Sequence, residues 1–427
     1  MEIKELSVGD KVILKTKEKQ WQGLILESYM PEIILLKLES GYNIGIREND
    51  ILQVKVLEKF KQIEKQEIKL EQDKKLKNIA MIITGGTISS RLDSKTGAVI
   101  STDTEEILNI SPEINKICNI IKIEKPFMKW SENMSFKDWK ILAETCENLL
   151  NNETISGIII THGTDFLHYT ASALSFFLGK LNKPIALTYS QRSIDRGSTD
   201  AALNLLCATK YATSDIAEVA IIGHKNLNDE VCLAMPGTKT RKMHTSRRDT
   251  FKVINDIPLA EISKTEFKIL KSFNARNNNK LKTDIKYNEN LALIQIYPGQ
   301  NPEILDFYKE KGYKAIILEL TGLGHLPTQQ GEYNWLPKLK KIIDSGTLVF
   351  GTCQTIYGSL NPKVYSAGRD IEKTGLVFLK DMLSETAFTK LAWCLGHSSW
   401  VKEKLIKEKM LENFHNEFND KLVFEDF

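Results

Sequence analysis

The feature that most constrains the fold of this chain is a short apolar run closed by two glycines. Residues 79–90 read IAMIITGGTISS, so an uncharged segment, 79–83, leads directly into TGGT at 84–87. An uncharged run of this length is typical of a strand buried on both faces of a parallel sheet. Paired glycines allow the backbone to turn sharply and to approach a ligand, because neither has a Cβ. The pattern therefore predicts a buried strand that presents the Thr87 hydroxyl at its carboxyl end, where ligands bind in open α/β sheets.

Alone, a strand followed by two glycines is most often an ordinary tight turn, and the sequence here is neither a dinucleotide fingerprint nor a P-loop. Residues 157–165 change this interpretation. They read GIIITHGTD, which predicts a second buried strand whose glycine turn presents Thr164, with the Asp165 carboxylate beside it. Two strands of one chain thus end in a glycine turn that presents a threonine.

This pair of motifs, in this order, resembles the signature of the L-asparaginase/glutaminase family. In that family TGGTI supplies the nucleophilic threonine, here Thr87, and HGTD supplies a second threonine and an aspartate, here Thr164 and Asp165. Residues 237–251 (GTKTRKMHTSRRDTF) resemble the family's lysine-bearing segment and place Lys242 at the catalytic lysine. The other basic residues of this segment are expected to be solvated or structural.

The resemblance also implies where the substrate binds. Residues 131–134 (SENM) are similar to the family's S-Q-D-M turn, whose first two residues hold the α-carboxylate and the α-amine of the substrate. These positions are Ser131 and Glu132 here, and the resemblance assigns Asp165 to the substrate as well. Glu132 replaces a glutamine that is frequent in the family and puts a negative charge near an ammonium group. Residues 90–101 are expected to form a mobile lid over the site.

The expected chemistry follows from these residue types. A threonine hydroxyl is a poor nucleophile at neutral pH and needs a base, which a desolvated Lys242 would supply. Asp165 would orient the lysine or Thr164, in a relay analogous to Ser-His-Asp, and backbone N–H groups of the HGT turn would stabilise the oxyanion. Either threonine could attack in such a relay. Following the family motif, we assign attack and an acyl-threonine to Thr87 and the second role to Thr164.

The order of apolar runs predicts an α/β protein with an asparaginase-like body of two parallel-sheet units. Strands and helices alternate over 79–275 and again over 286–427, which indicates sheets covered on both faces. Residues 1–57 contain several short apolar runs at close spacing, typical of a small SH3-like or Tudor-like β-barrel. Residues 58–78, rich in Glu, Lys and Gln, are expected to form a solvated linker helix.

The barrel and helix precede the point at which asparaginase bodies normally begin. With VGDKV and SGYNIGI in the barrel and KMHTSRRD and YSAGRD in the body, the chain resembles the D subunits of archaeal-type glutamyl-tRNA(Gln) amidotransferases. This implies that the chain hydrolyses glutamine and passes ammonia to an E subunit, which binds glutamyl-tRNA(Gln) and uses ATP and Mg²⁺. No cofactor is then expected in this chain. The pairing of bodies in the family implies a homodimeric core carrying two E subunits.

The composition of the chain agrees with the expectation that the E subunit, rather than this chain, binds the tRNA. The net charge, 58 − 55 = +3, is too balanced to indicate nucleic-acid binding by overall charge. No apolar run is long enough to span a bilayer, and the scattered cysteines and histidines suggest neither disulfides nor a metal site, so we expect a cytoplasmic protein. Two alternatives stay open: a free-standing asparaginase or glutaminase with an incidental barrel, and a non-catalytic binding protein or scaffold of the same fold.

Overall fold

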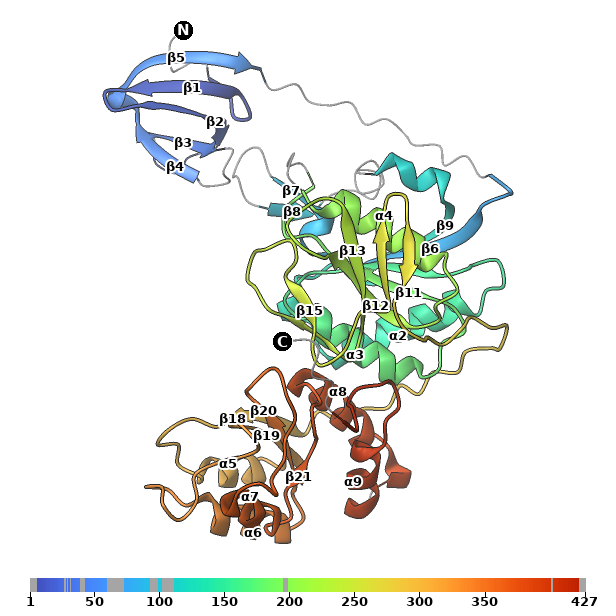
Figure 1. Ribbon diagram of the computed structural model, residues 1–427. Coiled ribbons are helices and arrows are strands. Elements are labelled where there is room, and N and C mark those ends of the chain that lie inside the picture. Colours follow the sequence, from blue (N-terminus) through green and yellow to red (C-terminus); the bar gives the residue numbers. More distant parts are fainter. Residues whose placement is uncertain are drawn as a thin grey trace.

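The computed structural model describes residues 6–59 apart from 27, 29, 31 and 39–42, and then residues 73–92, 99–101, 111–194, 199–400 and 402–421. Along the chain it contains an amino-terminal β unit, a large α/β unit and a smaller α/β unit, coloured dark blue, lighter blue through green to yellow, and orange to red in Figure 1. None of the helices among the described residues is long and apolar enough to cross a membrane.

The amino-terminal unit is all-β, as predicted. Its sheet is antiparallel, in the order β4-β3-β2-β1-β5, and it curls in Figure 1. Val12, Leu14 and Leu36 are fully buried inside it, because alternate side chains of each strand face the same side. The strands are β1 (Lys11–Thr16), β2 (Gln20–Leu26), β3 (Ile33–Leu38), β4 (Asn43–Arg47) and β5 (Ile51–Glu58).

The linker helix predicted over 58–78 falls largely on residues 60–72, which lie outside the described residues. At the edges of this range, Glu58 is the last residue of β5, and Lys77 and Asn78 open β6.

The large unit is built on an eight-stranded sheet in the order β17-β16-β13-β12-β11-β10-β6-β9. Side chains alternate between two cores. In β10, for example, Ile158 and Ile160 face one hydrophobic cluster and Ile159 faces the other. The parallel strands are β6 (Lys77–Ile83), β9 (Cys118–Glu124), β10 (Ile158–Thr161), β11 (Ile185–Thr188) and β12 (Val219–His224).

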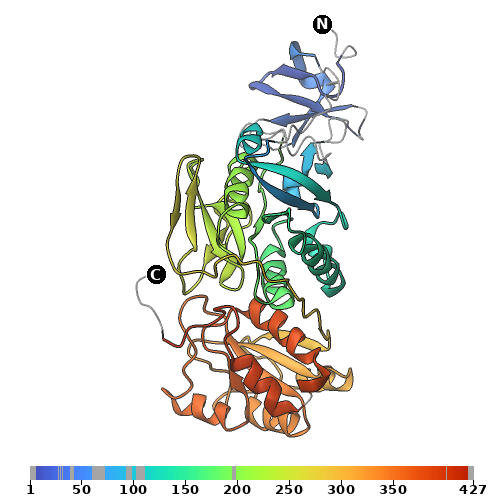
Figure 2. The same ribbon diagram turned by 90° about the vertical axis from the view of Figure 1, so that its right-hand side faces the viewer.

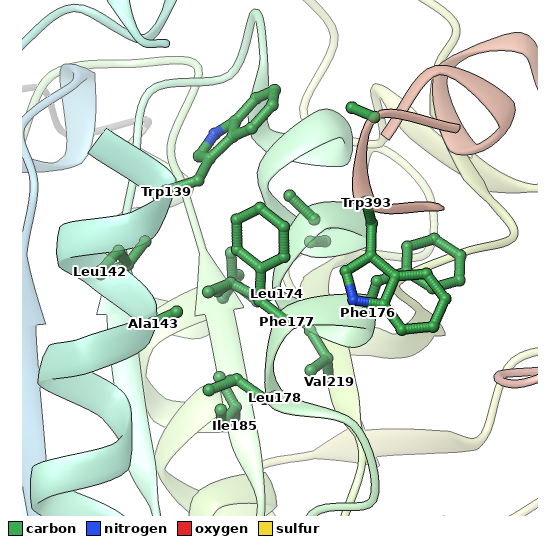
Figure 3. Packing of buried hydrophobic residues seen from close by; sticks show 14 of the residues in the cluster. Trp139, Leu142, Ala143, Leu174, Phe176, Phe177, Leu178, Ile185, Val219 and Trp393 are labelled. Carbon is green, nitrogen blue, oxygen red and sulfur yellow. The ribbon is translucent and has the colours of Figure 1, made fainter. Parts of the chain in front are cut away.

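Helices cover both faces of this sheet. Helices α2 (Phe136–Leu150) and α3 (Leu167–Leu178) contribute to one core, and α4 (Ala201–Ala212) contributes to the other. Figure 3 shows the first core, to which α2 contributes Leu142, α3 contributes Phe177 and Leu178, and the sheet contributes Ile185 beside Leu178. The two short runs 79–83 and 157–161 are therefore buried on both faces, as their lack of charge predicts.

The sheet is not parallel throughout, which corrects one part of the predicted architecture. Strands β13 (Val231–Pro236), β16 (Ala260–Ser263) and β17 (Phe267–Ile269) run antiparallel to their neighbours. The reason is the short connection between β12 and β13, because a parallel pair needs a crossover of a dozen residues or more. Two small antiparallel pairs lie outside the sheet: β7 (Ser90–Leu92) with β8 (Val99–Ser101), and β14 (Thr240–Lys242) with β15 (Phe251–Val253).

The smaller unit has a four-stranded parallel sheet. Its strands are β18 (Leu291–Gln295), β19 (Ala315–Leu320), β20 (Leu348–Cys353) and β21 (Val377–Phe378), in sequence order. Its helices are α5 (Ile304–Glu310), α6 (Trp335–Asp344), α7 (Ser366–Glu372), α8 (Ser384–Leu395) and α9 (Glu403–Leu411). The two α/β units lie one above the other in Figure 2.

The two α/β units share one hydrophobic core. Helix α8 contacts α3 of the large unit as well as strands of its own sheet. The aromatic rings of Phe176 and Trp393 stack across this boundary, with centroids 5.7 Å apart, and both appear in Figure 3. Because α3 begins just after the HGTD turn, this interface places the second unit close to the candidate site.

Candidate active site

The TGGT, HGTD and SENM turns pack directly against one another at the carboxyl edge of the large sheet. Strands β6 and β10 are parallel neighbours, and the Thr84 hydroxyl donates to the Thr161 carbonyl at 2.8 Å. Gly86 has φ of +82°, and a Cβ on it would lie 2.4 Å from the Cα of Gly163. A Cβ on Gly163 would in turn lie 2.8 Å from Ser131 Oγ. Only glycine at these two positions permits this contact between the three motifs.

Thr87 opens a short 3₁₀ turn, Thr87–Ser89, directly after the two glycines and is half-buried. The turn is fixed by its neighbours: the Ser89 N–H and the Ser90 hydroxyl both donate to the Gly86 carbonyl, at 3.0 and 2.7 Å. Within the part of the chain that the structure describes, no group hydrogen-bonds to the Thr87 hydroxyl. The Thr87 hydroxyl therefore follows the two glycines without a hydrogen-bond partner among the described residues.

Lys242 joins the second threonine and the aspartate into one cluster. Its Nζ donates to Thr164 Oγ1 at 2.8 Å and to Asp165 Oδ1 at 2.7 Å. The Lys242 side chain is 15% exposed, whereas that of Asp165 is 57% exposed, so the cluster opens toward solvent on the aspartate side. Three of the four residues predicted to be catalytic are therefore in direct contact, and the fourth, Thr87, belongs to the adjoining turn.

Ser131 is a buried part of the same edge. Its Oγ accepts hydrogen bonds from the backbone N–H groups of Asp165 and Phe166, at 3.0 and 3.3 Å. These two bonds fix the turn that leads into α3 and leave the Ser131 hydroxyl hydrogen available to an acceptor. Glu132, the next residue, is exposed. The predicted substrate-binding residues thus differ in setting, with Ser131 fixed and Glu132 open to solvent.

His162 supports the HGTD turn and is not a proton carrier at neutral pH. Burial lowers its pKa to about 4. Its Nδ1 lies 2.7 Å from the Gly163 carbonyl and therefore carries the hydrogen. Its Nε2 lies 2.9 Å from Thr170 Oγ1, which itself accepts from Trp139 Nε1 at 2.9 Å. The sequence places His162 in the HGTD motif but does not indicate this supporting role, and Thr170 and Trp139 carry no local signal of it.

The TGG turn contributes Gly85 and Gly86 to the wall of a cavity of about 270 Å³. Its volume is just below the usual range for ligand pockets. Lys129 in its wall is anchored by Asp138 at 2.6 Å. Burial raises the pKa of the Asp138 carboxyl, but Lys129 and Ser135 outweigh this and hold it below its ordinary value. The lining residues are Gly85, Gly86, Ser90, Met128, Lys129, Trp130 and Asn133.

The predicted lid over 90–101 is described only in part, because residues 93–98 lie outside the described residues. Among the described residues, no group of three or more His, Cys, Asp or Glu side chains is placed to hold a metal ion.

Three family descriptions match successive parts of the chain. Residues 6–57 match the GatD N-terminal domain, residues 78–274 match the N-terminal asparaginase domain, and residues 290–409 match the glutaminase/asparaginase C-terminal domain.

Relatives are similar over the whole length. The chain is 42% identical to the D subunit of glutamyl-tRNA(Gln) amidotransferase from Thermococcus kodakarensis, which aligns with 100% of this chain and 98% of the relative. It is 41% identical to the protein of the same name from Methanococcus maripaludis, over 98% of this chain and 100% of the relative.

Solved structures of similar fold are L-asparaginases. The thermostable L-asparaginase from Thermococcus kodakarensis has a TM-score of 0.70 and 26% identity, and covers 81% of this chain and 100% of its own. L-asparaginase I from Vibrio cholerae has a TM-score of 0.69 and 26% identity, and covers 81% of this chain and 99% of its own. The asparaginases thus match the α/β fold, whereas the amidotransferase subunits match essentially the entire chain.

Proposed function

Because the chain belongs to the family of glutamyl-tRNA(Gln) amidotransferase D subunits, we propose that it is the glutaminase subunit of a tRNA-dependent amidotransferase. It hydrolyses glutamine and supplies the ammonia with which a partner subunit converts Glu-tRNA(Gln) to Gln-tRNA(Gln). The observation that carries this proposal is the Lys242–Thr164–Asp165 cluster beside the turn that presents Thr87, in a chain that matches D subunits from end to end.

In the proposed reaction, Thr87 Oγ attacks the side-chain carboxamide carbon of glutamine. The C–N bond then breaks, ammonia leaves, and a γ-glutamyl ester of Thr87 remains until water hydrolyses it. We assign Lys242 as the base that takes up the Thr87 proton through Thr164, with Asp165 holding the lysine in place. Lys242 then returns this proton to the leaving nitrogen, so that Lys242 and Thr164 carry the same hydrogens after each half-reaction as before it.

The hydrogen-bonding pattern also suggests which donors serve the substrate. The N–H groups of Asp165 and Phe166 are used by Ser131, whereas no described backbone group accepts from the Thr164 N–H. We assign that N–H to the oxyanion. The Ser131 hydroxyl hydrogen is assigned to the α-carboxylate of glutamine, and Glu132 to its α-ammonium group.

The partner chemistry follows from the same family membership. We propose that an E subunit binds glutamyl-tRNA(Gln) and uses ATP and Mg²⁺, that this chain needs no cofactor of its own, and that two copies of it form the core of a cytoplasmic complex. The nearly balanced charge of this chain, +3 over 427 residues, supports placing the main RNA-binding surface on the partner.

The test is ammonia release from glutamine and from asparagine, measured with this chain alone and with the E subunit, glutamyl-tRNA(Gln) and ATP. We expect slow release from glutamine by the chain alone and faster release in the full mixture, with glutamine preferred. Fast release from asparagine that no partner changes would instead identify a free-standing asparaginase.

A further inference from the structure

The segment that carries Lys242 is held from the opposite side by the second α/β unit. Successive side chains of a strand point to opposite faces, so Arg241 of β14 points away from Lys242. While Lys242 reaches Thr164 and Asp165, Arg241 Nε lies 3.2 Å from Oε1 of Glu385, the second residue of α8. The contact crosses from the large unit to the smaller one.

Glu385 also reaches the element that carries Asp165. The same Oε1 lies 3.6 Å from Nε2 of His168, and both side chains are 8% exposed. His168 is the second residue of α3, one helical turn beyond Asp165. One buried carboxylate of the second unit therefore contacts both the strand that carries Lys242 and the helix start that follows Asp165.

We propose that Glu385 is a positioning residue for the catalytic cluster. Glu385 contacts both Arg241 and His168 and so holds β14 against the start of α3. This packing determines how closely Lys242 approaches Thr164 and Asp165. The inference rests on the proposed glutaminase function and deepens it, because it makes part of the second unit necessary for the geometry of a site whose assigned residues lie on the first.

The electrostatics of this contact favour a charged carboxylate. Burial raises the pKa of the Glu385 carboxyl, but His168 and Arg241 outweigh this, and the net pKa lies below its ordinary value. Glu385 in turn helps to raise the pKa of Tyr169, after the larger effect of burial. A buried charge is tolerated only when it is paired, so neutralising Glu385 releases both of its partners from a defined position.

Other contacts keep the two units together when Glu385 is changed. Lys239 Nζ pairs with Asp381 Oδ2 at 2.6 Å, and the Thr386 hydroxyl donates to the Thr238 carbonyl at 2.8 Å. These bonds hold residues 238 and 239, just before β14, on α8 and on the turn that precedes it. The substitution Glu385→Gln, which keeps the shape of the side chain, should therefore leave a folded protein in which mainly the position of Lys242 has loosened.

The experiment compares Glu385→Gln with Asp284→Asn. Asp284 pairs with His397 at 2.7 Å next to the far end of α8, so it offers a histidine–carboxylate contact, with a more exposed carboxylate, that touches neither Lys242 nor Asp165. Glutaminase kcat and KM and the melting temperature are measured for each variant and for the wild type, together with Glu385→Asp.

We expect Glu385→Gln to lower kcat by about tenfold or more with KM for glutamine changed less than about threefold, because small misplacements of catalytic groups act mainly on kcat. Glu385→Asp should recover part of the loss, and Asp284→Asn should keep kcat even if it melts earlier. Wild-type kcat in folded Glu385→Gln, or an equal loss of kcat in both variants at matched stability, would overturn the inference. If the wild type itself released no ammonia from glutamine, the proposed function would fail instead.

Discussion

The two sides of the segment 239–242 carry lysine–aspartate pairs with similar distances and opposite settings. On the unit interface, Lys239 lies 2.6 Å from Asp381, and their side chains are 1% and 0% exposed. On the open edge, Lys242 lies 2.7 Å from Asp165, and their side chains are 15% and 57% exposed. A lysine–aspartate pair alone therefore does not mark the site. The pair that we propose to be catalytic differs from the buried pair in its accessibility to solvent and in its contact with a hydroxyl group, that of Thr164.

Replacing Lys242 with methionine should have the largest effect, and it should fall on catalysis. The methionine keeps most of the apolar stem and removes the amine that contacts Thr164 and Asp165. We expect kcat for glutamine hydrolysis to fall by at least about 10³-fold, as for other members of catalytic relays, with the free energy of unfolding changed by less than about 1 kcal/mol. Steady-state kinetics and urea unfolding check both parts. Retention of a tenth of the wild-type kcat would remove Lys242 from the relay.

The same substitution at Lys239 should act on stability instead. It leaves the Asp381 carboxylate buried without its cation, which costs about 3 kcal/mol. We therefore expect Lys239→Met to lower the free energy of unfolding by about this amount, and Lys239→Met with Asp381→Asn to recover part of it. Urea unfolding curves measure the change. A Lys239→Met variant that is as stable as the wild type but does not hydrolyse glutamine would contradict a purely structural role for Lys239.

His162, which supports the HGTD turn at the open edge, should make the stability of the fold depend on pH. His162 has a pKa of about 4 in the folded protein, because it is buried, against about 6.5 in an unfolded chain. The unfolded state therefore binds the proton first, and stability falls as the pH drops from 6.5 toward 4. Between pH 7 and pH 5 this single group contributes a loss of about 2 kcal/mol.

The test is to compare the wild type with His162→Gln by urea unfolding at pH 7 and pH 5. The wild type should lose about 2 kcal/mol more than the variant over this interval, whatever their difference at pH 7. Equal losses in both proteins would mean that His162 is able to take up a proton in the folded state.

Much of the open edge could be predicted from the sequence, because the information there is local. Glycines at 85, 86 and 163 and the uncharged runs before them fix the strand ends, and the motifs single out Thr87, Thr164, Asp165 and Lys242. Their roles remain assignments from the family, while the contacts of Lys242 with Thr164 and Asp165 are a finding of the structure.

The unit interface could not be predicted in this way. Glu385 follows Arg241 by more than a hundred residues, and nothing in the sequence around either residue indicates the other. For the basic segment at 239–248, the sequence predicts only a solvated or structural role apart from Lys242. The structure shows Lys239 and Arg241 paired across the interface. The antiparallel β13 was missed because a short connection, rather than the strand's own composition, sets its direction.

The most direct test of the proposed chemistry is to identify the residue that attacks the substrate. The glutamine analogue 6-diazo-5-oxo-L-norleucine alkylates the nucleophile of a glutaminase, and peptide mass mapping locates the adduct. We predict a single adduct on Thr87 that requires Lys242 to form at the wild-type rate and is blocked by excess glutamine. An adduct on Thr164 would contradict the assignment of the nucleophile, and no adduct in a folded protein would contradict the acyl-threonine mechanism itself.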